Sequence, residues 1–325
     1  MRRRALVAGI GATAGWSRAT VAQTSQLPVV GLLSAASADA PSGPIEAIHL
    51  ALKQAGLEID RAVRMEYRFA DNEPGRLPQL AAELVRIPAA VIIALGGPGS
   101  ALAAKAATGT IPIVFAPVSE PVRGGLVASL NRPGGNITGI AALTIELDPK
   151  RLELLHELAP PGPLGVLVNP NRPDLQLQLE GIEAAALPLG RQLAIVHAGT
   201  SDAMASAFAT LQGRSIVGLL VGADAFFSSQ RNAIVALAAR HGWPAIYQWR
   251  EFVDAGGFAS YGPNLFESYR QTGIYVARIL KGEKPADLPV QQPTNFEFVI
   301  NMKTARTLGL AVRPALLSRA DDVIE

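Results

Sequence analysis

The chain has 325 residues, of which 49% are hydrophobic and 17% charged. This composition is typical of a well-buried globular protein and excludes an intrinsically disordered chain, and the length is sufficient for two domains. The formal net charge is +2 and the chain contains no cysteine. Disulfides, thiolate metal sites, a cysteine nucleophile and a lipid anchor on an N-terminal cysteine are therefore excluded.

The first residues have the pattern of an export signal. Arg2–Arg4 form a positive region, Leu6–Gly15 an apolar stretch, and small residues precede a cleavage point after Ala22. The apolar stretch is shorter than the roughly 20 residues that a membrane-spanning helix needs. We predict a signal peptide at residues 1–22, used by either the Sec or the twin-arginine route, and a soluble periplasmic protein.

Removal of this leader changes the charge balance. The leader contains four arginines and no acidic residue, so the mature chain has a formal net charge of −2. No run of lysine and arginine remains in the mature part. The electrostatic footprint of a nucleic-acid-binding protein is therefore absent from the sequence.

After the leader, apolar runs alternate with segments of helical spacing. The first series consists of VVGLLS (29–34), a helical segment at 45–56, VRMEYRF (63–69), a helical segment at 76–86, VIIAL, SALAAKAA, IPIVFA, RGGLVASL and NITGIAAL. This repeated β-α-β pattern predicts a parallel, doubly wound sheet.

A second series of the same kind begins after about residue 145. It consists of a helix at 146–159, a strand at 164–169, a helix at 174–187, a strand at 192–198, a helix at 201–212, a strand at 215–222, a helix at 226–242 and a strand at 244–249. The chain then continues with a short strand in GGFASYGPN, a long helix ending near Gly282, an extended proline-containing segment, the strand NFEFVIN and a short helix.

These patterns predict an α/β fold with two doubly wound parallel-sheet lobes. Elements that follow two complete series indicate that the chain crosses between the lobes more than once, which creates a hinge. We predict that lobe 1 comprises residues 27–140 plus 257–284, and that lobe 2 comprises residues 141–256 plus 285–325.

Enzyme classes find little support in the residues. The histidines are far apart and show no metal-ligand spacing, namely His49, His156, His197 and His241. No G-x-S-x-G nucleophile motif occurs. We expect neither a metal nor a cofactor.

The turn ALGGPGSALAAK at residues 94–105 has three interpretations. It is a weak dinucleotide loop, because the third glycine of G-x-G-x-x-G is replaced by Leu102 and the loop follows the third strand of the chain. It can also be a tight turn without ligand. In the third interpretation, bare backbone N–H groups at a helix start, with the Ser100 hydroxyl, bind an anion such as a carboxylate.

Other polar residues follow predicted strands and should share the rim where ligands of doubly wound sheets bind. Asp224 could equally be the N-cap of the helix that follows it. The candidate ligand-binding residues are Ser34, Gly96, Gly97, Ser100, Ser119, Glu120, Asn169, Asp224 and Tyr261.

Four segments carry a resemblance to a known family. They are RFADNEPGRLPQLAAELV, IPIVFAPVSEPVRGGLVASLNRPGGNITGI, REFVDAGGFASYGPN and ILKGEKPADLPVQQPTNFEFVINMKTARTLGL. The chain resembles, over essentially its whole mature length, the periplasmic substrate-binding proteins of ABC transporters, in the group whose members include tryptophan and tyrosine binders.

The resemblance implies a type I periplasmic-binding fold, with two lobes, three crossovers and one ligand closed between the lobes. It also implies that the turn at Gly96, Gly97 and Ser100 helps to hold the ligand, often an amino-acid-like carboxylate. Two residues depart from the family pattern: Glu120 stands where an aspartate is usual, and Gly97 replaces a small residue or threonine. Aromatic amino-acid specificity is therefore not transferred to this chain.

We accordingly expect a monomeric solute receptor that binds without catalysis and delivers a small molecule to the membrane permease of an ABC importer. Ligand would stabilise the closed form by its higher affinity for that form. An Asp224 carboxylate facing the α-helix start would suit an ammonium group and hence a zwitterion. The alternative is an exported enzyme or a sensor ligand domain with the same two lobes.

Overall fold

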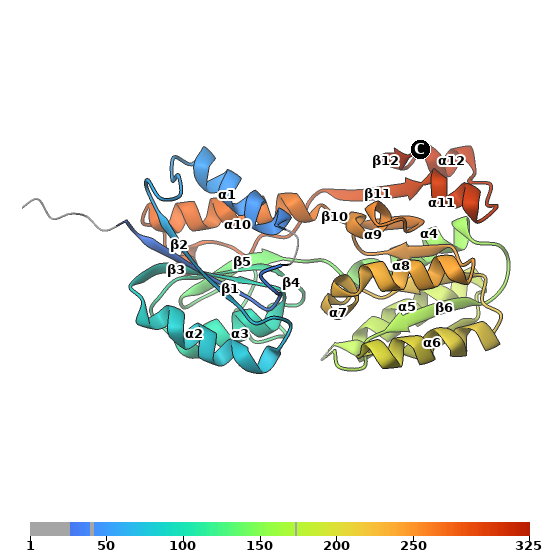
Figure 1. Cartoon of the computed structure of the whole chain (residues 1–325), viewed down its shortest axis with the longest axis horizontal. Coiled ribbons are helices and arrows are strands. Elements are labelled where there is room, and N and C mark those ends of the chain that lie inside the picture. Colours follow the sequence, from blue (N-terminus) through green and yellow to red (C-terminus); the bar gives the residue numbers. More distant parts are fainter. Residues whose placement is uncertain (1–26, 40–41, 173) are drawn as a thin grey trace, which may run out of the picture.

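The computed structural model describes residues 27–39, 42–172 and 174–325. The predicted signal peptide at residues 1–22 lies outside the described residues. The chain forms two α/β lobes that lie side by side and are joined by several passages of the chain (Figure 1). The predicted fold class is confirmed.

The first lobe contains a five-stranded parallel sheet in the order β2-β1-β3-β4-β5. Its strands are β1 (Val29–Ser34), β2 (Arg64–Phe69), β3 (Ala89–Leu95), β4 (Ile113–Val118) and β5 (Ile137–Ala141). The helices of this lobe are α1 (Gly43–Gln54), η1 (Pro74–Arg76), α2 (Leu77–Arg86), α3 (Pro98–Ala107) and α10 (Leu265–Leu280). Every residue of β1 and β5 is buried, as expected for parallel strands covered on both faces.

Alternate residues along the strands build the two cores of this lobe. Leu33 and Ile92 pack with α2 and α3 on one face of the sheet, whereas Leu32 and Ile93 pack with α1 and α10 on the other. Figure 1 shows α1 and α10 on one side of the sheet and α2 and α3 on the opposite side. A helix from far along the sequence thus completes the first lobe.

The second lobe contains a seven-stranded sheet in the order β12-β11-β10-β9-β8-β6-β7. Its strands are β6 (Leu164–Val168), β7 (Leu193–His197), β8 (Gly218–Val221), β9 (Ala245–Tyr247), β10 (Ala259–Pro263), β11 (Phe296–Asn301) and β12 (Asp322–Ile324). All neighbours are parallel except β10 and β11, which are antiparallel.

Helices cover both faces of this second sheet. One face carries α6 (Ser201–Gly213), α7 (Ala225–Ser229) and α8 (Arg231–Arg240), and the other carries α4 (Asp148–Leu158), α5 (Leu175–Leu189), α11 (Met302–Thr307) and α12 (Pro314–Leu317). The remaining short helices are η2 (Ile145–Leu147), α9 (Arg250–Asp254) and η3 (Pro285–Asp287). The single helix predicted at 226–242 is two helices, because Gln230 ends α7 and precedes α8.

Two lobe boundaries differ from those we predicted. Strand β10 pairs with β9 and β11, so residues 259–263 belong to the second sheet and not to lobe 1. Residues 288–291 remain with the first lobe, because the Thr138 hydroxyl donates to the carbonyl of Leu288 at 2.7 Å and Gln291 bridges to Ile140. Backbone pairing partners, which no local pattern specifies, decide both boundaries.

The segment RGGLVASL at 123–130 occupies the helical position of the β-α-β pattern but contains no helix. Two consecutive glycines, Gly124 and Gly125, weaken helix formation, and Gly125 has φ 70°. Leu126 and Val127 are nevertheless buried against the first sheet. The hydrophobic residues of this segment therefore predict its burial correctly, but they do not predict its secondary structure.

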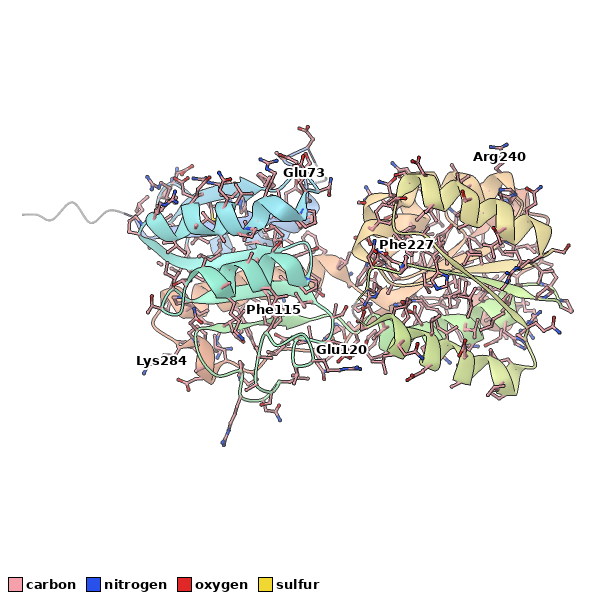
Figure 2. The ribbon with its side chains drawn as sticks, turned by 90° about the horizontal axis from the view of Figure 1, so that it is seen from below. Glu73, Phe115, Glu120, Phe227, Arg240 and Lys284 are labelled. Carbon is pink, nitrogen blue, oxygen red and sulfur yellow. The ribbon has the colours of Figure 1, made fainter. Side chains whose placement is uncertain are left out.

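The chain crosses between the lobes three times. The passages are residues 142–147 between β5 and α4, residues 263–265 between β10 and α10, and residues 292–295 before β11. The first two leave from the carboxyl ends of β5 and β10. The third enters β11 at the same edge, because β11 runs antiparallel to β10. The carboxyl edges of the two sheets consequently face each other (Figures 1 and 2).

The contact of α1 with α10 depends on a small residue. A Cβ atom on Gly273 of α10 would lie 2.7 Å from both the Ile48 carbonyl oxygen and the Ala51 Cβ of α1. We predict that Gly273→Ala destabilises the protein. Overpacking costs about 1–3 kcal/mol, which exceeds the gain of up to about 1 kcal/mol in helix propensity. Denaturant unfolding measures the difference.

Gly213 provides the matched control for this substitution. It is exposed at the end of α6, and a Cβ there would meet nothing within 4 Å. Gly213→Ala should therefore leave stability unchanged or raise it by up to about 1 kcal/mol. A Gly273→Ala protein as stable as Gly213→Ala would contradict the close packing of α1 on α10.

Candidate functional site

Both sheets reverse their strand order at one position, and predicted site residues lie there. In the first sheet, β2 lies on one side of β1 and β3, which comes later in the sequence, lies on the other side. In the second sheet, β7 and β8 flank β6 in the same way. Loops diverge from such a switch point at the carboxyl edge, where ligands of open α/β sheets bind. Ser34 is the last residue of β1, Gly96 follows β3, and Asn169 follows β6.

The backbone at the first switch point requires glycine. Gly96 has φ 83°, and a Cβ on it would lie 2.9 Å from the Cβ of Ala35. Gly97 has φ 104° and is the N-cap of α3. The Ser34 hydroxyl is already engaged locally, since it accepts a hydrogen bond from the Ala36 N–H at 3.2 Å. Residues with a side chain would be strained at both glycines.

The start of α3 offers unused hydrogen-bond donors. Gly97 has no side chain to cap the helix, so the first N–H groups after it have no side-chain acceptor at the N-cap. Ser100 is fully buried, and its hydroxyl has no hydrogen-bond partner among the residues that the structure describes. A buried polar group without a partner is unusual, and a helix N-terminus favours an anion. This region can therefore receive a carboxylate.

At the end of β4 the chain forms contacts with the first crossover. The Ser119 hydroxyl is hydrogen-bonded to the Thr144 hydroxyl at 2.5 Å. Glu120 has φ 47°, a strained value for a residue with a side chain, and it lies at the boundary between the lobes (Figure 2). Glu120 shares a hydrogen bond with the Glu146 carboxyl of η2. Both predicted residues thus lie beside the hinge.

The neighbouring Glu120 affects the charge state of Glu146. Desolvation, and after it the hydrogen bond with Glu120, raises the pKa of Glu146 to about 7. Two carboxyl groups at one place disfavour double ionisation. The crossover next to the first sheet therefore carries a group that titrates near neutral pH.

In the second lobe, Asp224 is engaged as a helix cap. Its Oδ1 accepts hydrogen bonds from the Phe226 N–H at 2.8 Å and from the Asn169 side-chain amide at 2.9 Å, and the Arg172 guanidinium lies 3.6 Å from its Oδ2. The N-cap alternative that the sequence left open is thus realised. The charge of Asp224 already has a partner within the lobe, which weakens its predicted role toward an ammonium group.

Two residues at this edge were missed by the sequence analysis. Arg172 donates to the Ala223 carbonyl at 2.7 Å and forms two hydrogen bonds with Asp174. Gln248 donates to the Asp224 carbonyl at 3.1 Å and to the Ser228 hydroxyl at 2.9 Å. Arg172 lies three residues after the predicted strand at 164–169, in the turn VNPNRP, whereas Gln248 lies inside the predicted strand at 244–249. Applying the strand-end rule to every polar residue of VNPNRP would have found Arg172. Gln248 follows the observed strand β9, which ends at Tyr247, earlier than predicted.

Tyr261 lies on β10 in the second sheet, two residues before the chain crosses to α10. Its ring is half-buried next to Phe296 and Phe298, at centroid distances of 6.3 and 6.5 Å. Its carbonyl accepts a hydrogen bond from Arg151 at 2.6 Å. The predicted position at a crossover agrees with the structure, although the lobe is the second one.

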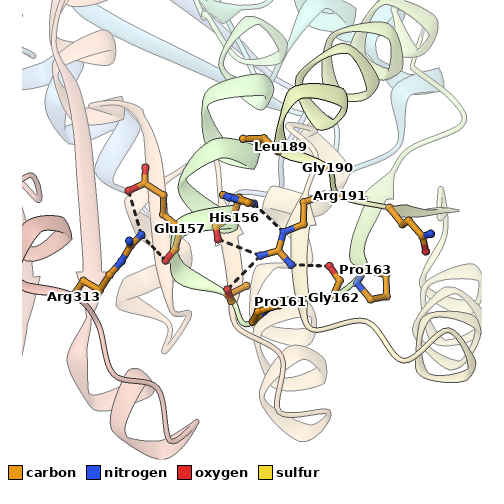
Figure 3. Close-up of a pocket in the computed structure, with 11 residues that line it drawn as sticks. His156, Glu157, Pro161, Gly162, Pro163, Leu189, Gly190, Arg191 and Arg313 are labelled. Carbon is orange, nitrogen blue, oxygen red and sulfur yellow. Dashed lines mark hydrogen bonds and ion pairs between the residues drawn. The ribbon is translucent and has the colours of Figure 1, made fainter.

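A cavity of about 780 Å³ lies far from these residues. It is formed around the end of α4 and the segments before β6 and β7, at the amino edge of the second sheet (Figure 3). Arg191 lines it and donates to the carbonyls of Pro160, Gly162 and His156. This arginine is used to hold the end of α4, so the cavity adds nothing to the site at the carboxyl edge.

Three of the four histidines, namely His49, His156 and His241, have partners of an ordinary kind. His49 is hydrogen-bonded to the Tyr67 hydroxyl at 2.8 Å, His156 accepts from Arg191, and His241 stacks on Trp243. Within the described ranges, no cluster of three metal-ligating residues occurs. No helix in that part of the chain combines the length and the apolar character needed to cross a membrane.

The pKa of Glu146 leads to a prediction on stability. A carboxyl whose folded pKa is raised from 4.5 to about 7 destabilises the folded state progressively as pH increases between these values. We predict that Glu146→Gln is more thermostable than the wild type at pH 8 but not at pH 4.5. Thermal unfolding at both pH values measures the effect.

Glu120→Gln should reproduce part of this effect, because it removes the second carboxyl of the pair. Glu153→Gln on α4 serves as the control, since Glu153 is paired with Lys150 at 2.7 Å at the surface. A pH-independent difference between Glu146→Gln and the wild type would contradict the raised pKa.

Known proteins resemble this chain over most of its length. The profile of the family described as "ABC transporter substrate binding protein" matches residues 29–324. A tyrosine-binding protein of Clostridioides difficile (strain R20291) is 28% identical over 261 residues, covering 80% of this chain and 74% of the relative.

Two solved structures are similar over almost the whole chain. The ABC domain from Streptococcus pneumonia in complex with L-Trp has a TM-score of 0.83 at 23% identity, covering 92% of this chain and 100% of the other. A conserved domain protein from Vibrio cholerae has a TM-score of 0.82 at 27% identity with the same coverage. The first likeness shows the type I periplasmic-binding fold that we predicted.

Proposed function

Because the chain belongs to the ABC transporter substrate-binding protein family, we propose that it binds an amino acid or a related small carboxylate between its lobes. The observation that carries this proposal is the start of α3, at the switch point of the first sheet. Backbone donors lie there together with the buried Ser100 hydroxyl, which has no partner in the described part of the chain. Relatives that bind tyrosine and L-Trp support the same ligand class.

The two facing edges contribute differently to this binding. Gly96, Gly97 and Ser100 of the first lobe have donors available for a ligand carboxylate. Asn169 and Asp224 of the second lobe are hydrogen-bonded to each other, so they shape the opposite wall. Binding proceeds without catalysis, and the ligand stabilises the lobe arrangement for which it has the higher affinity.

We further propose that the protein is exported by the signal peptide at residues 1–22, acts in the periplasm as a monomer and delivers its ligand to the permease of an ABC importer. Ser34, Ser119, Glu120 and Tyr261 complete the proposed ligand surroundings. The departures at Glu120 and Gly97 lie in this region, so the ligand side chain need not be aromatic.

The first experiment identifies the ligand. We predict that L-tryptophan, L-tyrosine or another amino acid raises the thermal unfolding midpoint, since a ligand at 100 times its Kd stabilises by about 2.7 kcal/mol. Tryptamine and tyramine, which lack the carboxylate, should have no effect. Mass spectrometry of any ligand that stays bound during native purification identifies acids that are not among the amino acids tested by thermal unfolding. Equal stabilisation by tryptophan and tryptamine would refute carboxylate binding at α3.

The second experiment tests Ser100. We predict that Ser100→Ala weakens binding of the identified amino acid by about 1.5–3 kcal/mol, the usual value of a hydrogen bond to a charged group. The unliganded protein should not lose stability, because the hydroxyl has no partner within the described residues. Calorimetric titration and thermal unfolding give the two values.

Ser206→Ala is the matched control, because Ser206 lies on the exposed face of α6 in the second lobe. It should bind the ligand as the wild type does. Unchanged affinity in Ser100→Ala would remove this hydroxyl from the site. Turnover of the bound compound would favour the alternative, an enzyme built on the same two lobes.

A further inference from the structure

A buried ion pair lies at the start of α4, directly after the first crossover. The side chains of Asp148 and Arg151 are both completely buried, and Arg151 Nη1 donates to Asp148 Oδ1 at 2.5 Å. Arg151 is the largest of the fully buried side chains in the described part of the molecule. Neither residue was assigned a role by the site described above.

Arg151 binds two passages of the chain that are far apart in sequence. Its Nη1 donates to the Thr144 carbonyl at 2.8 Å, within the first crossover. Its Nε donates to the Tyr261 carbonyl of β10 at 2.6 Å, two residues before the second crossover. One planar guanidinium, which presents several donors in a fixed geometry, thus fastens the first crossover and the strand that leads into the second crossover to α4.

Asp148 connects the same pair to the carboxyl edge of the second sheet. Its Oδ2 accepts a hydrogen bond from the Gln178 amide of α5 at 2.6 Å, and the Ala223 N–H after β8 also donates to it. Glycine at position 222 leaves room for this network, because a Cβ there would lie 2.9 Å from the Gln178 Nε2. The pair therefore links α4, α5 and the loop before α7.

Thr144 is held from both lobes. Its hydroxyl bonds to Ser119 of the first lobe, and its carbonyl accepts from Arg151 of the second. Because Thr144 is held from both sides, a rotation of one lobe against the other must change the backbone conformation next to this residue. The second crossover has a similar position at Asn264, whose amide donates to Glu297 of β11 at 2.6 Å.

We propose that the Asp148–Arg151 pair is the positioning element of the hinge, which fastens the first crossover and the strand that leads into the second crossover to α4, and so limits the relative orientations that the lobes adopt. Replacing a buried ion pair by apolar residues of similar size is often neutral for stability, whereas removing one partner is costly. The hydrogen bonds that the pair makes to distant segments, rather than a gain in net stability, therefore explain why two charged residues are buried at the start of α4.

The double variant Asp148→Leu/Arg151→Met separates an effect of the ion pair on lobe orientation from an effect on stability. Because the chain has no cysteine, spin labels can be attached at Ala106→Cys on α3 and Arg240→Cys on α8, both exposed. Arg240 lies on the outer side of the second lobe (Figure 2). We expect a folded double variant whose inter-label distance distribution, measured without ligand, is broader than that of the labelled parent.

Phe208→Ala is the control for general destabilisation, because Phe208 is buried in the core between the second sheet and α6. It should lower the unfolding midpoint and leave the distance distribution unchanged. A double variant with the distribution of the parent would overturn the proposal. So would equal broadening in Phe208→Ala, because the effect would then be that of any core defect.

A milder variant keeps the positive charge. Arg151→Lys cannot donate to Thr144 and Tyr261 with one rigid group, and we expect faster amide hydrogen exchange in residues 142–147 and 261–264 than in the wild type. Unchanged exchange in both segments would also overturn the proposal. None of these measurements uses a ligand, so their outcome is independent of whether the protein binds an amino acid.

Discussion

The pairing of β1 with both β2 and β3 is the constraint on which the rest of the arrangement depends. It places later strands on the far side of β1 and so creates a switch point at its carboxyl end. Strand β6 does the same in the second sheet. Since the crossovers connect the carboxyl edges, the two switch points face each other, and residues more than one hundred positions apart come to share one region.

The two edges differ in how their polar groups are satisfied. At the second edge, Asn169, Arg172, Asp224 and Gln248 form hydrogen bonds with one another or with the local backbone. At the first edge, the start of α3 retains donors, and the Ser100 hydroxyl is buried without a partner among the described residues. A satisfied network is rigid, whereas unpaired donors can gain from a ligand. In the binding mode that we propose, the first lobe therefore donates hydrogen bonds to the ligand and the second lobe shapes the opposite wall.

Most elements could be predicted from the sequence because their signals are local. The apolar runs of parallel strands and the spacing of helices such as α1 and α2 depend only on residues within each segment. One failure has a local cause, the two consecutive glycines of RGGLVASL, and the other has a non-local cause, the pairing partners of β10. RGGLVASL is buried but not helical, and β10 joins the second sheet because β9 and β11 offer it partners. The turn residues Ser34, Gly96 and Asn169 were found because strand ends are visible in a sequence.

By itself, the sequence determined the two α/β series, the glycine-rich start of α3, the absence of thiol chemistry and the family. The tertiary structure alone decided which polar groups are already hydrogen-bonded: Asp224 caps α7, while the Ser100 hydroxyl has no partner within residues 27–39, 42–172 and 174–325. It alone brought Arg151 to the carbonyls of Thr144 and Tyr261. The physical reason is that hydrogen bonds between distant segments depend on strand order and chain crossings, and these follow from pairings that no local pattern encodes.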